Sequence, residues 1–88
     1  MRMVEWLVIS TEEAEDQNPS TMRPGFTDLQ DAKDCHEELM GDNPYPYEVY
    51  ARTRFGAKWE HVGKRHASDD TTINVKAKAK FGVEATDL

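Results

Sequence analysis

The pattern of apolar and polar residues along the chain predicts three strands, and a hairpin described below adds a fourth. Residues 3–10 are apolar at odd and even positions alike, which is typical of an interior strand covered on both faces. Residues 47–53 alternate between apolar and polar side chains, as a half-buried strand does. Residues 71–81 alternate most regularly, and the lysines on their second face predict that this face is wet.

A hairpin is expected where the second strand ends. The Arg54-Phe55-Gly56 segment suits a three-residue loop with glycine in the left-handed position. Such a loop pairs Ala51 with Trp59 and Val49 with His61, so the sequence predicts Trp59 on the inner face of the sheet, under the helix.

The helical period predicts one helix, at residues 28–40. Residues 27–30 match the capping-box pattern, in which Thr27 accepts from a backbone N–H and Gln30 reaches back, and Gly41 follows as a cap. His36 lies within the apolar stripe, so we expect it to be a hydrogen-bonded histidine at the edge of the core. The stripe comprises Leu29, Ala32, His36, Leu39 and Met40.

The rest of the chain reads as connecting segments. Residues 11–25 combine acidic side chains with turn-forming residues and predict a long, flexible acidic loop, and residues 82–88 predict a flexible tail. Residues 1–88 are therefore expected to form a single small α+β domain of order β-α-β-β-β. One helix packs on one face of a roughly four-stranded, mainly antiparallel sheet.

The number of cysteines and the length of the apolar runs restrict the expected cellular location of the protein. The chain of 88 residues has one cysteine, Cys35, so an intramolecular disulfide framework is excluded and a reducing, cytoplasmic location is expected. The apolar run near the start is too short for a signal-peptide core, and nowhere do eighteen apolar residues follow one another. We expect neither export nor a membrane span.

Catalytic and metal-binding patterns are weak. Cys35, His61 and His66 lack the short paired spacings typical of zinc sites, and phosphate-loop, serine-elbow and dinucleotide motifs are absent from the sequence. Acidic neighbours make Cys35 a poor nucleophile, so a buried, unreactive thiol is expected. The prediction is a protein that is not an enzyme and uses no cofactor or metal. A small enzyme built around Cys35, His61 and His66 is the weaker alternative.

Charge is distributed unevenly along the chain. The net charge is -6, with eleven acidic residues against three basic ones up to residue 42, and eight basic against six acidic ones after it. The molecule should therefore have an acidic and a basic region, and the two are expected to prefer different partners.

The acidic region predicts a surface for a protein partner with a basic surface. Four carboxylates fall within about 80° of one another around the predicted helix. Together with the acidic loop, they would stand where phosphates stand in a basic groove. Phe55 is expected to be exposed at the hairpin tip, where a partner would cover it. The predicted partner-binding residues are Asp31, Asp34, Glu38, Asp42, Glu12, Glu13 and Phe55.

The preferred functional hypothesis is a non-catalytic binding protein acting through this acidic surface. Its size and charge would suit an inhibitory or accessory protein of a phage or mobile element, although no particular residue indicates that role.

A nucleic-acid-binding sheet face is the alternative hypothesis. Basic side chains from two predicted strands would gather there around a tyrosine, and like charges placed together cost stability unless an anion uses them. Lysines on a wet or edge strand also prevent strand pairing, and a net charge of -6 repels a polyanion, so this hypothesis ranks second. The residues are Tyr50, Arg52, Lys58, Lys76, Lys78 and Lys80.

Overall fold

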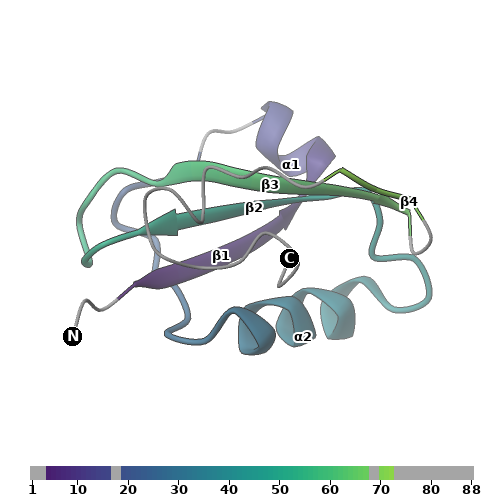
Figure 1. Cartoon of the computed structure of the whole chain (residues 1–88), viewed down its shortest axis with the longest axis horizontal. Coiled ribbons are helices and arrows are strands. Elements are labelled where there is room, and N and C mark those ends of the chain that lie inside the picture. Colours follow the sequence, from purple (N-terminus) through teal and green to yellow (C-terminus); the bar gives the residue numbers. More distant parts are fainter. Residues whose placement is uncertain (1–3, 17–18, 68–69, 73–88) are drawn as a thin grey trace.

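The chain folds into a small α+β structure with an antiparallel sheet between two helices (Figure 1). The computed structural model describes residues 4–16, 19–67 and 70–72. The elements in chain order are β1 (Glu5–Ser10), α1 (Thr11–Asp16), α2 (Leu29–Met40), β2 (Tyr47–Arg52), β3 (Glu60–Ala67) and β4 (Asp70–Thr72). The predicted α+β class and antiparallel pairing are confirmed for β1, β2 and β3.

Two parts of the predicted element order need revision. Residues 11–16, for which the sequence predicts an acidic loop, form the short helix α1, so the described residues contain two helices instead of one. Of the strand predicted at 71–81, the structure describes only the start, as β4, which pairs antiparallel with β3. Residues 73–81 and the tail predicted at 82–88 lie outside the described residues.

β1 lies at an edge of the sheet and not inside it, contrary to the prediction. Its only neighbour among the described strands is β2, with Trp6 opposite Ala51. On its other side the chain returns at Phe26, where the Trp6 N–H donates to the Phe26 carbonyl at 2.7 Å and the Phe26 N–H donates to the Trp6 carbonyl at 2.8 Å. α1 and α2 pack on opposite sides of the sheet, so both faces of β1 are covered (Figure 1). This is why β1 has buried apolar residues at successive positions.

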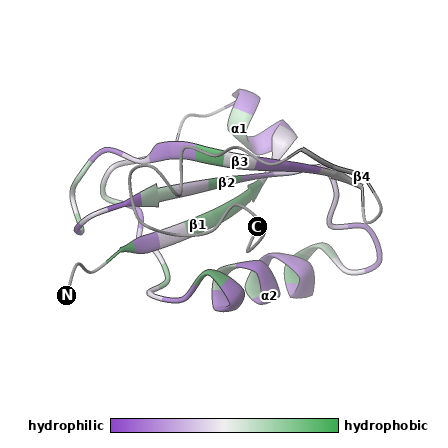
Figure 2. Ribbon diagram, viewed as in Figure 1, coloured by the Kyte–Doolittle hydropathy of each residue, from purple (hydrophilic) through white to green (hydrophobic). Residues whose placement is uncertain are grey.

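The core is divided by the sheet into two apolar clusters. The larger one lies under α2 and the smaller one lies on the α1 side, while much of the α2 ribbon is hydrophilic (Figure 2). Side chains that are adjacent in a strand point to opposite faces, so β1 contributes buried residues to both clusters. The larger cluster comprises Trp6, Val8, Leu29, Ala32, Tyr47, Val49, Ala51 and Val62, and the smaller one Leu7, Ile9 and Trp59.

The hairpin between β2 and β3 has a different register from the predicted one. Ala51 pairs with Glu60 and not with Trp59, and a bulge follows between Val49 and Tyr50. A slip of one residue moves a side chain to the other face of a sheet. Trp59 is therefore buried on the α1 side, and its predicted place under the helix is wrong.

α2 begins one residue later than predicted and ends as predicted. Asp28, and not Thr27, caps its first turn, because the Asp28 side chain accepts from the Gln30 N–H at 2.8 Å. Gly41 has a φ of 69°, and its N–H donates to the Glu37 carbonyl at 2.9 Å.

Only the first part of the predicted apolar stripe of α2 is buried. Leu29, Ala32 and His36 face the sheet, whereas Leu39 is 80% exposed and Met40 45% exposed. Leu39 lies about 60° around the helix from His36, at the margin of the stripe and towards the acidic side. The predicted burial of Leu39 and Met40 is therefore wrong.

Replacing Gly25 with alanine is expected to lower the free energy of unfolding by about 1–3 kcal/mol, the usual cost of overpacking. A Cβ at Gly25 would lie 2.5 Å from Cη2 of Trp59 and 3.0 Å from the Trp6 carbonyl oxygen, and neither group moves easily. Urea unfolding measures the effect, with Thr27→Ala at an exposed site of the same segment as the control. Equal stability of the two variants would contradict the packing of Trp59 on Gly25.

Candidate functional site

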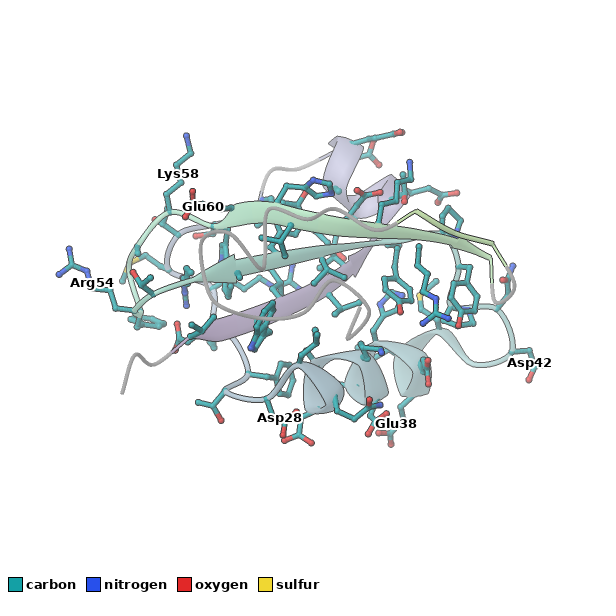
Figure 3. The ribbon with its side chains drawn as sticks, viewed as in Figure 1. Asp28, Glu38, Asp42, Arg54, Lys58 and Glu60 are labelled. Atoms are coloured by element: carbon teal, nitrogen blue, oxygen red, sulfur yellow. The ribbon has the colours of Figure 1, made fainter. Side chains whose placement is uncertain are left out.

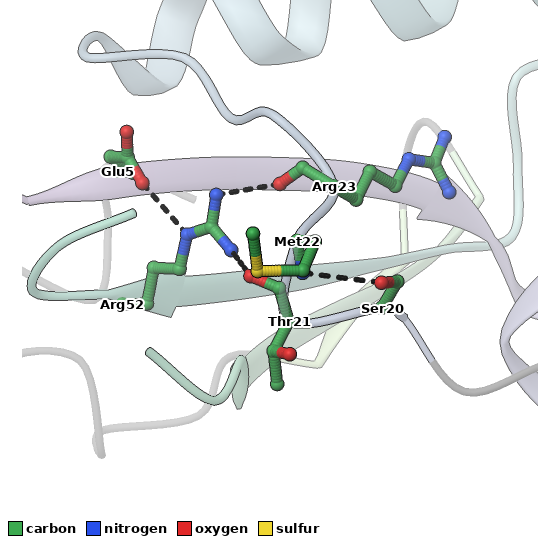
Figure 4. Close-up of polar contacts among 6 residues, drawn as sticks. All are labelled: Glu5, Ser20, Thr21, Met22, Arg23 and Arg52. Atoms are coloured by element: carbon green, nitrogen blue, oxygen red, sulfur yellow. Dashed lines mark hydrogen bonds and ion pairs between the residues drawn. The ribbon is translucent and has the colours of Figure 1, made fainter. Parts of the chain in front are cut away.

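Arg52 is a buried cation that holds the segment before α2 against the sheet (Figure 4). Its side chain is 0% exposed, and Nε donates to Oε1 of Glu5 at 2.7 Å. Nη1 donates to the Thr21 carbonyl, and Nη2 donates to the Arg23 carbonyl at 2.6 Å. Three acceptors from two separate parts of the chain therefore converge on one guanidinium group, as its fixed fork of donors allows.

Two aromatic rings complete the surroundings of Arg52. The guanidinium carbon lies 4.0 Å from the ring centroid of Trp59 and 5.0 Å from that of Phe55. A group enclosed in this way is not available to a phosphate, so the predicted place of Arg52 on a wet, anion-binding face is wrong. The structure keeps Lys58 exposed and Tyr50 half-buried on that face. Lys76, Lys78 and Lys80 lie outside the described residues.

A second polar cluster surrounds the buried carboxylate of Glu48. The Thr11 hydroxyl donates to Oε2 at 2.7 Å, Nε2 of His61 lies 2.7 Å from Oε1, and Nζ of Lys64 lies 3.6 Å from Oε2. Tyr50 meets the His61 ring edge-on, with 5.3 Å between centroids. Burial, and to a lesser degree the Glu48 carboxylate, raise the pKa of Tyr50.

This Glu48 cluster borders an open cleft of about 320 Å³ beneath α1. A carboxylate that orients an imidazole is one element of general base catalysis, but a nucleophile must lie within reach of the imidazole. The Thr11 hydroxyl donates to Glu48 instead, and Cys35 belongs to α2 on the other face of the sheet. The contacts of Glu48 therefore join Thr11, the first residue of α1, to β2 and β3.

Cys35 and His61, two of the three residues of the alternative enzyme hypothesis, lie on opposite faces of the sheet. Cys35 is half-buried and not fully buried as predicted, and it lies across the sheet from His61. The side chain of His66 lies outside the description. Within residues 4–16, 19–67 and 70–72, no group of three or more His, Cys, Asp or Glu side chains is arranged to hold a metal ion.

His36 occupies the position that its helical spacing predicts. It is buried at the edge of the larger apolar cluster, and its Nε2 donates to the Pro44 carbonyl at 2.9 Å. Its ring packs edge-on against Tyr47, with centroids 5.3 Å apart. The interpretation of His36 as a hydrogen-bonded core histidine is confirmed.

The acidic residues of α2 face away from the sheet, as the helical wheel predicts. Asp31, Asp34, Glu38 and Asp42 are exposed, and Figure 3 shows Glu38 on the outer side of the helix and Asp42 beyond its end. We call these four residues the acidic face of α2. Its position leaves all four carboxylates accessible to a partner.

The other predicted partner-binding residues do not extend this face. Glu13 lies on α1 and pairs with Arg23 at 2.7 Å, whereas Glu12, also on α1, lines a cleft that Met40 at the end of α2 lines too. Phe55 is 53% exposed, as predicted, but its loop lies at the opposite end of the molecule from Asp42, as the neighbouring Arg54 shows in Figure 3. The predicted site is therefore divided among three regions.

The C-terminal end of α2 concentrates negative charge beside apolar side chains. Its last turn contains no basic residue, while Glu37, Glu38 and Asp42 lie at the negative end of the helix dipole. Leu39 and Met40 are exposed within the same turn. The exposure of these two residues was not predictable from the sequence, because their spacing alone assigns them to the core.

A smaller cleft of about 250 Å³ lies where α1 begins and α2 ends. The Thr11 N–H donates to the Pro46 carbonyl at 3.2 Å and joins its two sides. The ring of Tyr45, which lines the cleft, stacks on the buried ring of Tyr47 with centroids 5.4 Å apart. Burial raises the pKa of Tyr47, and Arg65 opposes that rise. The cleft is lined by Ser10, Thr11, Glu12, Met40, Asn43, Tyr45 and Pro46.

Within the described parts of the chain, no helix is long and apolar enough to cross a membrane. Comparison with protein-family models, with curated proteins and with solved structures gives no match to this chain.

Proposed function

We propose that this protein is a non-catalytic binding protein whose acidic face of α2 docks onto a basic surface of a protein partner. The observation that carries the proposal is the combination at the end of α2: exposed carboxylates lie next to Leu39, which is 80% exposed. Charge alone is compatible with a solvated helix face. An exposed leucine within the charged turn adds apolar area that a partner would bury.

The electrostatics of α2 support the same proposal. Negative side chains at the C-terminal end of a helix oppose its dipole and one another, so this arrangement lowers the stability of the free protein. Lysine or arginine side chains of a partner would relieve both repulsions. The stability given up in the free protein is thereby recovered in the complex, and charge also steers the encounter.

A protein partner is favoured over nucleic acid by the sign of the charge. The acidic face repels phosphate, and Arg52, which the alternative hypothesis places on an anion-binding face, is enclosed by Glu5 and two aromatic rings. Lys58 is exposed, but it lies at the hairpin end, away from Asp42 (Figure 3).

The triple variant Asp31→Asn, Asp34→Asn, Glu38→Gln is expected to keep its fold and to associate about tenfold more slowly at low salt. The substituted side chains are exposed, so the free energy of unfolding should change by less than about 0.5 kcal/mol. The parent protein is immobilised to capture a basic protein from a host lysate. The association rate of that partner is then measured for parent and variant at several salt concentrations, and the salt dependence should be smaller for the variant.

Two lysine variants control for the loss of charge, one removing a single charge and one removing three. Lys58→Gln, and the triple variant Lys76→Gln, Lys78→Gln, Lys80→Gln, should associate at the parental rate or slightly faster, since both changes make the protein more acidic. If the triple lysine variant loses binding while the acidic variant retains it, the nucleic-acid alternative replaces this proposal.

A further inference from the structure

The cleft at the junction of α1 and α2 has the form of a receptor for one apolar side chain. Met40, Tyr45 and Pro46 provide its apolar wall, and Met40 is 45% exposed there. Its volume of about 250 Å³ exceeds the roughly 150 Å³ of an apolar cavity that takes up benzene. A phenylalanine or leucine side chain therefore fits, whereas a second large side chain would not.

The wall of this cleft is held in place before any ligand arrives. Tyr45 stacks on Tyr47, and the Arg65 guanidinium lies 5.9 Å from the ring centroid of Tyr45. The hydrogen bond from the Thr11 N–H to the Pro46 carbonyl fixes α1 against the chain that follows α2. Binding would thus require little ordering of the site, which favours affinity.

Carboxylates flank the cleft on both sides. Glu12 of α1 lies in its lining, and on the α2 side Asp42 is next to Asn43, which also lines it. Asp42 follows the C-terminal end of α2, where the negative end of the helix dipole lies, whereas Glu38 lies about 160° around the helix from Met40 and faces away from the cleft. The charge at the entrance is therefore complementary to cations on both sides of an apolar group.

We infer that this cleft binds a large apolar side chain from a basic segment of the protein partner, with lysine or arginine on either side of the apolar residue. The inference rests on the proposed function and specifies the partner's chemistry. The flanking cations contact Glu12 on one side and Asp42 on the other. The apolar side chain packs on Met40 and Tyr45, and Leu39 extends the apolar contact outside the cleft.

Two synthetic peptides test the inference directly. The first has a central phenylalanine between two pairs of lysines, and the second has serine in place of the phenylalanine. The full chain should bind the phenylalanine peptide at least tenfold more tightly, as burial of one large apolar side chain allows. Binding is followed by NMR titration, in which the backbone signals of Met40, Asn43 and Tyr45 should shift with the first peptide and much less with the second.

Variants separate the cleft from the charge around it. Asn43→Trp, at an exposed position on the lining, should fill the cleft and abolish the preference for phenylalanine while leaving the affinity for the serine peptide unchanged. Met40→Gln should do the same by replacing part of the apolar wall with a neutral polar side chain. The pair Glu38→Gln, Asp42→Asn should weaken both peptides by a similar factor.

The outcomes distinguish failure of this inference from failure of the proposed function. Equal affinity for both peptides, with binding still reduced by Glu38→Gln, Asp42→Asn, would overturn the cleft inference and leave the acidic docking face intact. If neither peptide responds to those acidic substitutions, the proposed function itself is overturned.

Discussion

Replacing Arg52 with methionine is expected to lower the free energy of unfolding by about 3–5 kcal/mol, the range for removing one partner of a buried ion pair. The substitution leaves the Glu5 carboxylate, whose side chain is only 17% exposed, without its cation. It also removes the donors that hold the carbonyl groups of Thr21 and Arg23. Urea unfolding measures the loss, which is large for a domain of this size.

Three comparisons separate the role of Arg52 from a general effect of charge. Arg54→Met, in the exposed loop of the same hairpin, should change stability by less than about 0.5 kcal/mol. Arg52→Lys should remain destabilising, because an ammonium group does not reproduce the planar fork of donors. Combining Arg52→Met with Glu5→Gln should recover part of the loss, because no uncompensated carboxylate remains. Similar stabilities for the Arg52 and Arg54 variants would contradict the structural role of Arg52.

Replacing Trp59 with alanine is expected to cost about 3–5 kcal/mol of stability, the range for a large buried aromatic residue. Trp59 forms the smaller apolar cluster with Leu7 and Ile9, and its ring also lies under the Arg52 guanidinium. The variant therefore loses apolar burial and the cation–π contact together. Thermal unfolding followed by circular dichroism measures the effect.

Phe55→Ala is the matched control for Trp59→Ala. Phe55 also contacts Arg52, but it is 53% exposed, so its truncation should cost less than about 1 kcal/mol. A Trp59→Ala variant that melts within a few degrees of the parent would show that Trp59 contributes little to the core. It would then become a residue to test for partner contact.

Features fixed by local chemistry could be predicted from the sequence, and features that depend on distant residues could not. The end of α2 at Gly41 and the buried position of His36 follow from helical spacing and capping. The hairpin register does not, because one residue more or less in the loop decides which face Trp59 occupies. Strand alternation placed Arg52 correctly on the face opposite Ala51, but not its burial, which depends on acceptors at residues 5, 21 and 23.

Of the candidate site, the exposed carboxylates could be predicted from the sequence, and the cleft and the Glu48 cluster could not. The exposure of Asp31, Asp34 and Glu38 follows from the helical wheel, because these three residues lie on one side of α2, and Asp42 follows its end. The cleft beside Met40 was not predictable, because the start of α1 and the chain after α2 meet there only through the tertiary fold. The Glu48 cluster likewise joins three elements, and no spacing in the sequence indicates it.

The pairing of Phe26 with Trp6 determines how this protein would self-associate when it is destabilised. An uncovered edge strand is a template for pairing with another chain. Here two backbone hydrogen bonds between Phe26 and Trp6, one donated by each residue, cover the outer edge of β1. The segment that carries Phe26 is held in turn by Arg52. Loss of Arg52 would therefore free β1 to pair with a second molecule, so self-association through this strand should accompany the loss of stability.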